Sequence, residues 1–387
     1  MTPISNRGRA TCVAAGLSRT VSICMAAAAS LIGVTALPHA AHAGEAPKFA
    51  VDASWPKPLP NNWIIGQVGG ITADPKGHIW VFHRPRSLTD DEKGAALTPP
   101  RSKCCISAPP VLEFDEAGNL LRSWGGPGEG YEWVGREHGI EVDDKGFVWL
   151  TGNAENDNVV LKFTTDGKFV SQIGKIAPTR GSNDTTVLGK PAETTYDKDA
   201  NELYIADGYG NRRVIVFDAA TGAYKRHWGA YGNKPNDDKQ AAYDPKAPVS
   251  QQFGNPVHCV KVTNDGFVYV CDRINNRIQV FKKDGSFVTE WFYEKNTLGN
   301  GAVWDVAVWP DPKQSYLLSA DGENNEIRIL RREDGSVVGS FGGNGRNAGQ
   351  FHWVHAMAID AKGNVYTAEV DTGKRIQKFK LTSDALR

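Results

Sequence analysis

Three histidines at matched places in the sequence could together bind a metal ion. Each is the second residue of a short strand-like segment, in Glu137-His138-Gly139-Ile140, Val257-His258-Cys259-Val260 and Val354-His355-Ala356-Met357. Three neutral imidazoles with a coordination position left open are the ligand set expected for a catalytic zinc ion. A buried histidine that stands alone is more often a core residue bonded to the backbone. The metal hypothesis therefore depends on whether the fold brings the three together.

Two arginines and a tyrosine form a second group of candidates. Arg84 and Arg273 occupy equivalent positions where a strand-like segment gives way to a loop, and Tyr209 lies one residue further on in a loop flanked by glycines. Two guanidinium groups near a dication suit an anionic substrate group or a developing oxyanion. They would also favour the ionised form of a neighbouring tyrosine, which could then act as a base. The alternative for each arginine is a salt bridge to a nearby aspartate.

One structural unit recurs along the chain and explains these spacings. Each copy reads as four short strands with period-2 alternation, joined by turns that carry glycine or aspartate. The copies run from Gly69 to Gly125, Glu137 to Gly174, Ala192 to Gly229, Val257 to Trp291, Trp304 to Gly342 and Val354 to Phe379. The sixth copy lacks its fourth strand, and the segment from Lys48 to Trp55 can supply it. We therefore predict an all-β, six-bladed β-propeller closed by an N-terminal strand.

The ring geometry turns the three histidines into one candidate site. When the copies are aligned on the turn after their first strand, the matched residues are Gly69, His138, Ala192, His258, Trp304 and His355. Histidine thus occupies blades two, four and six. Because alternate blades of a six-fold ring are related by 120°, we expect the imidazoles to converge at the mouth of the central channel. Two inserts, Pro85 to Pro110 and Lys234 to Gln252, are either loops that shape this site or tolerated surface insertions.

The first 43 residues have the pattern of a cleaved secretory signal. Arg7, Arg9 and Arg19 precede an apolar run from Ile23 to Leu37, and Ala41-His42-Ala43 matches a cleavage site. We therefore expect residues 44–387 to form a single domain that is exported to the periplasm or secreted, without a membrane span. The chain has 44 basic and 44 acidic side chains, so losing those three arginines leaves a net charge of about −3, which argues against a nucleic-acid partner. We expect a monomer.

Four cysteines remain after the signal and allow two disulfides. Cys259 and Cys271 lie on two strands of one predicted hairpin and could pair across it, and the adjacent Cys104 and Cys105 could form a vicinal bridge. Buried or free thiols are the alternative for each pair. The sequence contains no Cys-x-x-Cys motif, so no thiolate metal site is predicted.

Taken together, these motifs resemble the peptidyl-α-hydroxyglycine α-amidating lyases, a family of six-bladed propellers built from NHL-type repeats. The resemblance covers nearly all of residues 44–387. It is carried by Val81-Phe82-His83-Arg84, His138-Gly139-Ile140 with Asp143, Asp207-Gly208-Tyr209 with Asn211 and Arg213, Pro256-Val257-His258, Asp272-Arg273 with Asn276-Arg277-Ile278, and Val354-His355.

The resemblance implies a role for each candidate residue. Zinc would be held by His138, His258 and His355, Tyr209 would be the base, and Arg84 and Arg273 would bind and polarise the substrate. The reaction of the family splits a carbinolamide, R-CO-NH-CH(OH)-CO₂⁻, into a primary amide and glyoxylate. A small-molecule or peptide substrate is therefore expected, with C–N lyase activity.

Two residues depart from the family pattern, and other functions stay open. Trp353 stands where the family has a methionine beside the substrate, which predicts a reshaped pocket. Ala356 replaces the aspartate of the family's structural calcium site, so a calcium ion is in doubt. One alternative is a zinc-dependent hydrolase or hydratase that uses the same histidines to activate water. Another is a non-catalytic NHL propeller that binds a ligand or a protein partner.

Overall fold

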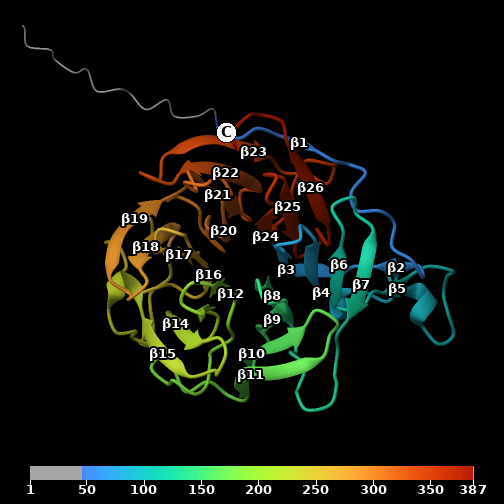
Figure 1. Cartoon of the computed structure of the whole chain (residues 1–387), viewed down its shortest axis with the longest axis horizontal. Helices are drawn as coiled ribbons and strands as arrows, with labels where there is room; N and C mark the ends of the chain where they lie inside the picture. The colour runs from blue at the N-terminus through green and yellow to red at the C-terminus, as the bar shows by residue number, and fades with distance from the viewer. Residues whose placement is uncertain (1–45, 387) are drawn as a thin grey trace, which may run out of the picture. The chain divides into compact units, whose positions relative to one another are not determined.

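Six four-stranded antiparallel sheets are arranged around a common axis in the computed structural model, which describes residues 46–386 (Figure 1). The predicted signal, residues 1–43, lies outside the described residues. Blade one contains β3 (Gln67–Ala73), β4 (Ile79–Arg84), β6 (Val111–Phe114) and β7 (Leu120–Trp124). Blade two contains β8 (Glu137–Val142), β9 (Phe147–Gly152), β10 (Asp157–Thr164) and β11 (Phe169–Ile176). Blade three contains β12 (Glu193–Asp197), β13 (Glu202–Asp207), β14 (Arg213–Asp218) and β15 (Tyr224–Trp228).

The second half of the ring repeats the same architecture. Blade four contains β16 (Val257–Val262), β17 (Phe267–Asp272), β18 (Arg277–Lys282) and β19 (Phe287–Phe292). Blade five contains β20 (Asp305–Val308), β21 (Tyr316–Asp321), β22 (Glu326–Arg331) and β23 (Val337–Gly342). Blade six contains β24 (Val354–Ile359), β25 (Val365–Glu369) and β26 (Ile376–Leu381), and its fourth strand is β1 (Phe49–Val51). The propeller predicted from the sequence is therefore confirmed.

An N-terminal strand closes the ring, as predicted. β1 pairs with β26 in antiparallel register, with Phe49 opposite Leu381 and Val51 opposite Phe379. Trp55, which follows this strand, is buried, and its ring lies 5.0 Å from that of Tyr366 in blade six. The same ring lies 5.8 Å from Phe114 in blade one. The segment after β1 thus packs across the junction between the last and first blades.

Apolar side chains fill the spaces between adjacent blades. Blades one and two share one such cluster, in which Phe82 packs with Val142, Leu150 and Phe163. Blades three and four share another, which joins Tyr204 and Val216 to Val260 and Phe281. Adjacent blades pack face to face, so the second strand of a blade is buried along nearly its whole length, as β4 and β17 show.

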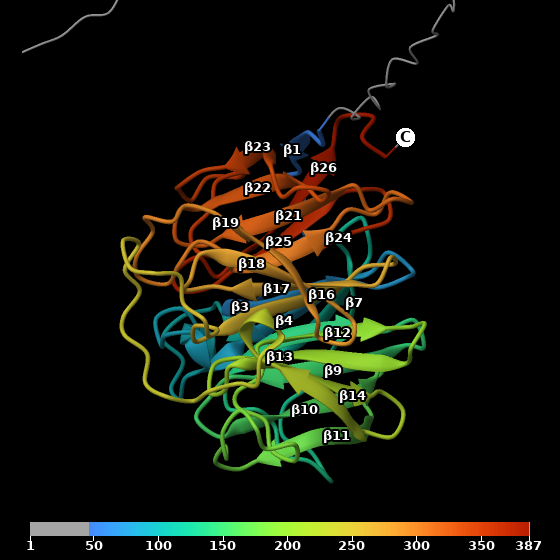
Figure 2. The same ribbon diagram turned by 90° about the vertical axis from the view of Figure 1, so that its left-hand side faces the viewer.

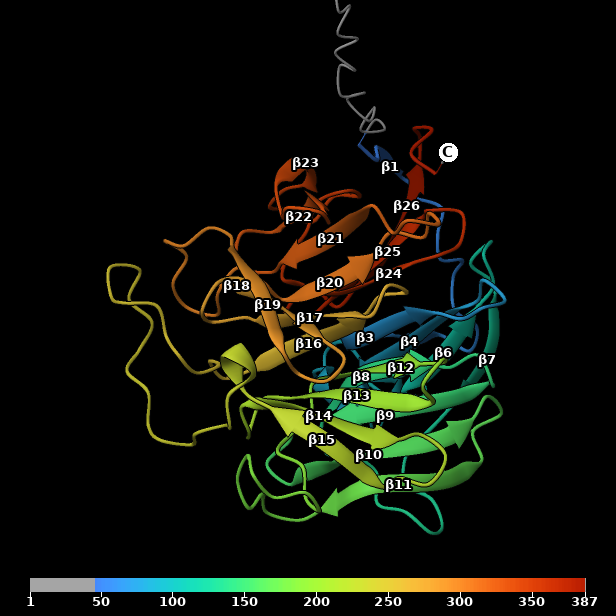
Figure 3. The ribbon, with the colours of Figure 1, turned by 60° about the vertical axis from the view of Figure 1, so that its left-hand side comes forward.

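Both inserts lie on the left of Figure 2, on the side of the ring from which the inner strand β12 starts. The first includes the 3₁₀ turns η1 (Pro85–Ser87) and η2 (Gly94–Ala96) and the strand β5 (Ile106–Ser107), which pairs in parallel with β2 (Trp63–Ile64). This two-stranded sheet was not predicted, because each strand has only two residues. The second insert follows η3 (Ala230–Gly232) and extends as a long loop between β15 and β16 (Figure 3).

Both candidate disulfides form in the structure. Cys259 on β16 is bonded to Cys271 on β17, and Cys104 is bonded to Cys105 in the first insert. The first of these bridges ties together the strand that carries His258 and the strand that leads to Arg273. Within residues 46–386, no helix has the length and apolar character that a membrane span requires.

Candidate metal centre

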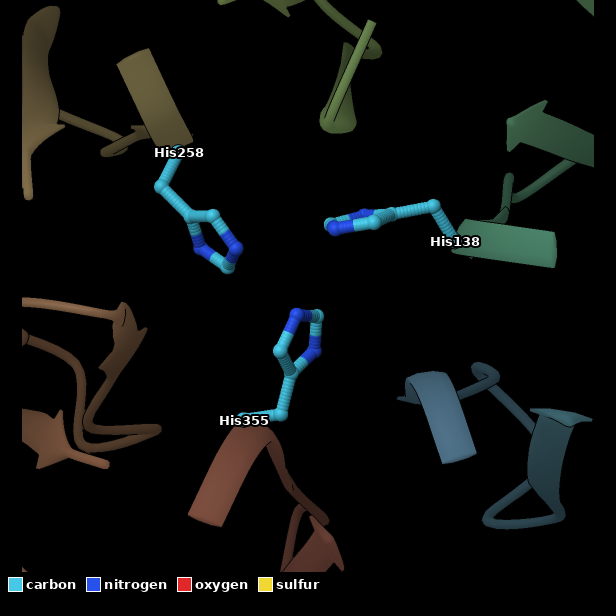
Figure 4. Close-up of side chains that lie close together, drawn as sticks. All are labelled: His138, His258 and His355. Atoms are coloured by element: carbon cyan, nitrogen blue, oxygen red, sulfur yellow. The ribbon is translucent and has the colours of Figure 1, made fainter. Parts of the chain in front are cut away.

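His138, His258 and His355 converge on the propeller axis (Figure 4). The centroids of their rings are 5.2 Å apart for His138 and His258, and 4.7 Å apart for each of the other two pairs. All three side chains are buried, and each offers one nitrogen to a group in which these atoms lie within 4.8 Å of one another. Three rigid strands therefore present three nitrogen atoms to one point.

A bulge in each inner strand aims the imidazole at the axis. On β16, Val257 is opposite Asp272 and Cys259 is opposite Cys271, so His258 is the extra residue. β24 has the same irregularity at His355, and β8 has one between Glu137 and Ile140. Because a bulge bends its strand and redirects the side chain, it explains why a histidine at this place leaves the ladder and points inward.

Backbone carbonyls of the next blade orient two of the rings. Nδ1 of His138 lies 2.8 Å from the carbonyl oxygen of Ala192, and Nδ1 of His258 lies 2.5 Å from that of Trp304. A carbonyl oxygen only accepts hydrogen bonds, so Nδ1 carries the proton in both rings and Nε2 keeps its lone pair. This tautomer directs a metal-binding nitrogen to the centre of the channel. Nδ1 of His355 is buried without a hydrogen-bond partner.

The donor set fits a transition-metal dication. Burial, together with the positive charge of neighbouring groups, lowers the pKa of all three histidines well below the usual value, so the rings are neutral. Neutral imidazoles in a trigonal arrangement suit zinc and leave a position for substrate. The hydrogen bonds at Nδ1 of His138 and His258 leave Nε2 of both rings free to bind such an ion. These residues could therefore hold a metal ion.

Tyr209 lies directly over this cluster. Its hydroxyl is 3.1 Å from Nε2 of His138 and 3.0 Å from Nε2 of His258. Asp207, fully buried at the end of β13, fixes the loop by accepting hydrogen bonds from the backbone of Gly189 and the side chain of Arg213. Gly208 is required because a Cβ atom there would lie 2.0 Å from the carbonyl oxygen of Val257. The loop thus packs against blade four and places the phenol beside the histidines.

Arg273 approaches the same hydroxyl and keeps donors free. Its Nη1 donates to the hydroxyl of Tyr209 at 3.2 Å, and its guanidinium stacks on Trp304 at 4.5 Å from the ring centroid. Its Nε is buried and has no hydrogen-bond partner. A buried guanidinium with an unused donor is costly unless an anion binds it. This geometry favours an anionic ligand at the mouth of the channel.

Arg84 is held by polar contacts that are not ion pairs. Its Nε donates to the carbonyl oxygen of Glu137 at 2.8 Å, and its Nη1 donates to Oε1 of Gln67 at 2.7 Å. Burial lowers its pKa to about 10, which still leaves it protonated at neutral pH. Its positive charge helps to lower the pKa of all three histidines, and it also interacts electrostatically with Tyr209. Arg84 therefore belongs to the same electrostatic site.

The salt-bridge alternative is wrong for Arg84 and Arg273. Other arginines, on or just before the third strands, pair with the buried acidic residues at the ends of the second strands. These pairs are Asp207–Arg213, Asp272–Arg277, Asp321–Arg328 and Glu369–Arg375. Asp207, Asp272 and Asp321 also anchor the loops that follow them, by accepting hydrogen bonds from Asn211, Asn275 and Asn324. Repeated ion pairs thus build the scaffold, while the two candidate arginines remain available.

Trp353 lies at the rim of the site beside Trp304. Their ring centroids are 5.4 Å apart, and Trp304 in turn lies 5.8 Å from His355 and 6.0 Å from His258. Trp353 has a left-handed backbone with φ of 53°, and its N–H donates to Oδ1 of Asn325 at 2.7 Å. The two indoles and the guanidinium of Arg273 therefore form one continuous wall.

Some residues take places that the sequence did not predict. Gln67 contacts Arg84 and Trp304 contacts Arg273. Trp304 was matched to the histidines in the alignment of the repeats, but nothing in the sequence indicated that either residue supports an arginine. His83, adjacent to Arg84, is a structural residue: its Nε2 donates to the carbonyl of Pro109 at 3.0 Å, and its Nδ1 accepts from the backbone of Gly66 at 3.2 Å. Burial lowers its pKa to about 4, so it stays neutral.

Comparisons with known proteins agree with this architecture. No family model matches the chain. NHL repeat-containing protein 3 of Mus musculus is 27% identical over 364 residues, which are 90% of this chain and 89% of the mouse protein. Peptidyl-alpha-hydroxyglycine alpha-amidating lyase 1 of Drosophila melanogaster is 27% identical over 354 residues, which are 86% of this chain and 59% of the fly protein.

The chain resembles NHL-repeat proteins and amidating lyases. This resemblance is the one that the histidines, arginines and tyrosine indicated. Among solved structures, a Bacteroides thetaiotaomicron protein of unknown function aligns with a TM-score of 0.54 and 16% identity, covering 88% of this chain and 73% of that protein. This likeness supports the fold alone.

Proposed function

We propose that the chain is a zinc-dependent carbon–nitrogen lyase that splits a carbinolamide into a primary amide and glyoxylate. The observation that carries this proposal is the position of Tyr209, whose hydroxyl lies within 3.2 Å of two candidate metal ligands and of Arg273. A base beside a Lewis acid and an arginine is what removal of a proton from a carbinol requires. The similarity to the fly lyase supports the same reaction.

The residues of this site can divide the work in a simple way. His138, His258 and His355 would hold the zinc ion, and a bound zinc ion would supply a Lewis acid that lowers the pKa of the substrate hydroxyl. The phenolate of Tyr209 would accept the hydroxyl proton, with its charge stabilised by Arg273. Arg84 and Arg273 would orient the anionic substrate by donating hydrogen bonds to its oxygens.

The bond changes balance without a further reactant. As the O–H bond breaks, its electron pair forms the C=O bond of glyoxylate, and the C–N bond breaks toward nitrogen. The leaving amide nitrogen then takes one proton, which Tyr209 can return. Tyr209 thus ends in its starting state, and no water is consumed. Burial of the three histidines and Arg84 lowers the local dielectric and strengthens these charge interactions.

Glyoxylate release from α-hydroxyhippurate tests this function. Zinc-loaded protein should release glyoxylate and benzamide in equal amounts, well above the uncatalysed rate. Absence of glyoxylate release by fully zinc-loaded protein would refute the lyase. Release of benzoate and an amine from a simple amide would instead indicate a hydrolase.

We further propose that the protein acts outside the cytoplasm. The signal pattern in residues 1–43 and the two disulfides support this location, because disulfides persist in oxidising compartments. Fractionation of expressing cells should recover a processed chain that begins near Gly44. Recovery of the full-length chain from the cytoplasm would contradict this proposal.

A further inference from the structure

A second cavity opens between blades one and two, beside the candidate metal centre. Its volume is about 370 Å³, which lies in the range of small-molecule sites. Its lining includes two indoles, three prolines and a charged pair, which are Trp63, Trp133, Pro85, Pro109, Pro110, Arg86 and Glu137. We name this cavity the Trp63–Trp133 pocket.

Glu137 connects the pocket to the metal centre. Its carboxylate Oε1 accepts hydrogen bonds from Arg86 at 2.9 Å and from the indole of Trp133 at 3.0 Å, and Oε2 is buried without a partner. Its backbone carbonyl accepts the hydrogen bond from Arg84, and the next residue is His138. The pocket and the site of reaction therefore share one rigid stretch of β8.

The pocket is held open by its own framework. The first insert is fixed by the pairing of β2 with β5 and by the bond from His83 to the carbonyl of Pro109. Arg86 also donates to the carbonyls of Val134 and Gly135. At Gly125, with φ of 109°, a Cβ atom would lie 2.8 Å from Trp133. Glycine at this position leaves the indole face clear.

The two arginines set the direction of a bound substrate. Blades one and four are opposite in a six-bladed ring, so Arg84 and Arg273 reach the reacting group from opposite sides. Arg273 has a free buried donor and no acidic partner, which suits the carboxylate. Arg84 already uses Nε and Nη1, which leaves its remaining N–H groups for a carbonyl oxygen. The acyl end of the substrate would then extend over Arg84, toward the pocket.

We propose that the Trp63–Trp133 pocket binds an aromatic side chain on the residue that precedes the reacting glycine, which makes the substrate an aromatic N-acyl dipeptide or peptide. This inference rests on the proposed function. Glu137 lines the pocket and the next residue, His138, points at the axis. Their Cα atoms are about 3.8 Å apart and their side chains extend away from each other, so the pocket lies on the order of 10 Å from the histidines. An aromatic residue next to the glycine spans this distance, and indole walls bind a planar ring with little loss of side-chain entropy.

Matched substrates test the pocket. N-acetyl-tryptophanyl-α-hydroxyglycine should be cleaved with kcat/KM at least about tenfold above that of N-acetyl-alanyl-α-hydroxyglycine. Trp63→Ala should bring this ratio close to one, and Ser107→Phe, which fills the pocket without removing a wall, should do the same. Trp291→Ala, a change to a partly buried tryptophan in blade four, should leave the ratio unchanged. Equal kcat/KM for the two substrates in the wild type would overturn the inference.

A binding measurement separates this inference from the proposed function. N-acetyl-tryptophanyl-glycine and N-acetyl-alanyl-glycine lack the hydroxyl and cannot react, so calorimetry on zinc-loaded protein reports recognition alone. Tighter binding of the tryptophanyl compound in the wild type, lost in Ser107→Phe, would support the pocket even if no glyoxylate were ever released. Glyoxylate release with no aromatic preference in either assay would leave the lyase standing and refute the pocket.

Discussion

Nδ1 of His138 lies 2.8 Å from the carbonyl oxygen of Ala192, and the two residues hold the same position in successive blades. His258 repeats this relationship with Trp304 in the next pair of blades. For His138 and His258, the bulged inner strand therefore places the imidazole on the axis, and the following blade supplies the carbonyl that fixes its tautomer. Blades without histidine at this position thus contribute to the site through their backbone.

This arrangement predicts the metal content of the protein. Purified protein should carry about one zinc ion, and His258→Ala should lose most of it while remaining folded, because the ring depends on blade packing and not on the metal. His227→Ala, a partly exposed histidine on β15, is the matched control and should retain the metal. Full zinc occupancy in the His138/His258/His355 triple variant would place the ion elsewhere.

Loss of the N-terminal strand should destabilise the ring. A chain that begins at Asn61 lacks β1 and the buried Trp55, so the edge of β26 is exposed and an apolar space opens between blades one and six. Replacing a buried tryptophan alone typically costs about 3–5 kcal/mol. Urea denaturation should show a fall in unfolding free energy of at least this size relative to a chain that begins at Ala46. Equal midpoints for the two chains would mean that the ring closes in another way.

Two partly buried glutamates in the channel, Glu141 and Glu193, predict a pH-dependent stability. Burial raises the pKa of Glu141 to about 7, and burial with the nearby carboxylate of Asp305 raises that of Glu193 to about 8, although Lys261 partly opposes both shifts. Between about pH 5 and 8 the folded state then binds more protons than the unfolded state, in which glutamate ionises near 4.5. The free energy of unfolding should therefore fall as pH rises through this window.

Thermal unfolding in EDTA at pH 5 to 8.5 checks this dependence. Glu141→Gln removes one of the two titrating groups. As pH rises, the Tm of the wild type should therefore fall more than the Tm of this variant. Glu129→Gln, which changes an exposed glutamate, should run parallel to the wild type. A constant difference between the wild type and Glu141→Gln across the range would show that Glu141 does not titrate there.

The sequence predicted the blades because their signal is local and repeated. Period-2 alternation and glycine turns located all six repeats. The sixth repeat ends near Phe379 without a fourth strand of its own, so a strand from the N-terminus had to complete it. The histidines were found by their matched position in alternate repeats. The convergence of His138, His258 and His355 follows from ring symmetry, which a sequence of repeats implies.

Other features depend on contacts between distant segments and could not be predicted. The bulges at His258 and His355 are shifts in strand register, and no residue type marks them. The channel cluster of Glu193, Lys261 and Asp305 joins three blades, so its members are far apart in the sequence. The Trp63–Trp133 pocket likewise needs a two-residue strand pairing to exist.

Tyr209→Phe, followed by glyoxylate release and zinc content, tests the central claim most directly. The change keeps the ring and its packing but removes the hydroxyl that lies 3.1 Å from His138 and 3.0 Å from His258. Loss of general-base catalysis should lower kcat by about 10²–10⁴ with zinc content unchanged. Unchanged kcat in zinc-loaded Tyr209→Phe would contradict the account, because the phenol would then have no part in the reaction.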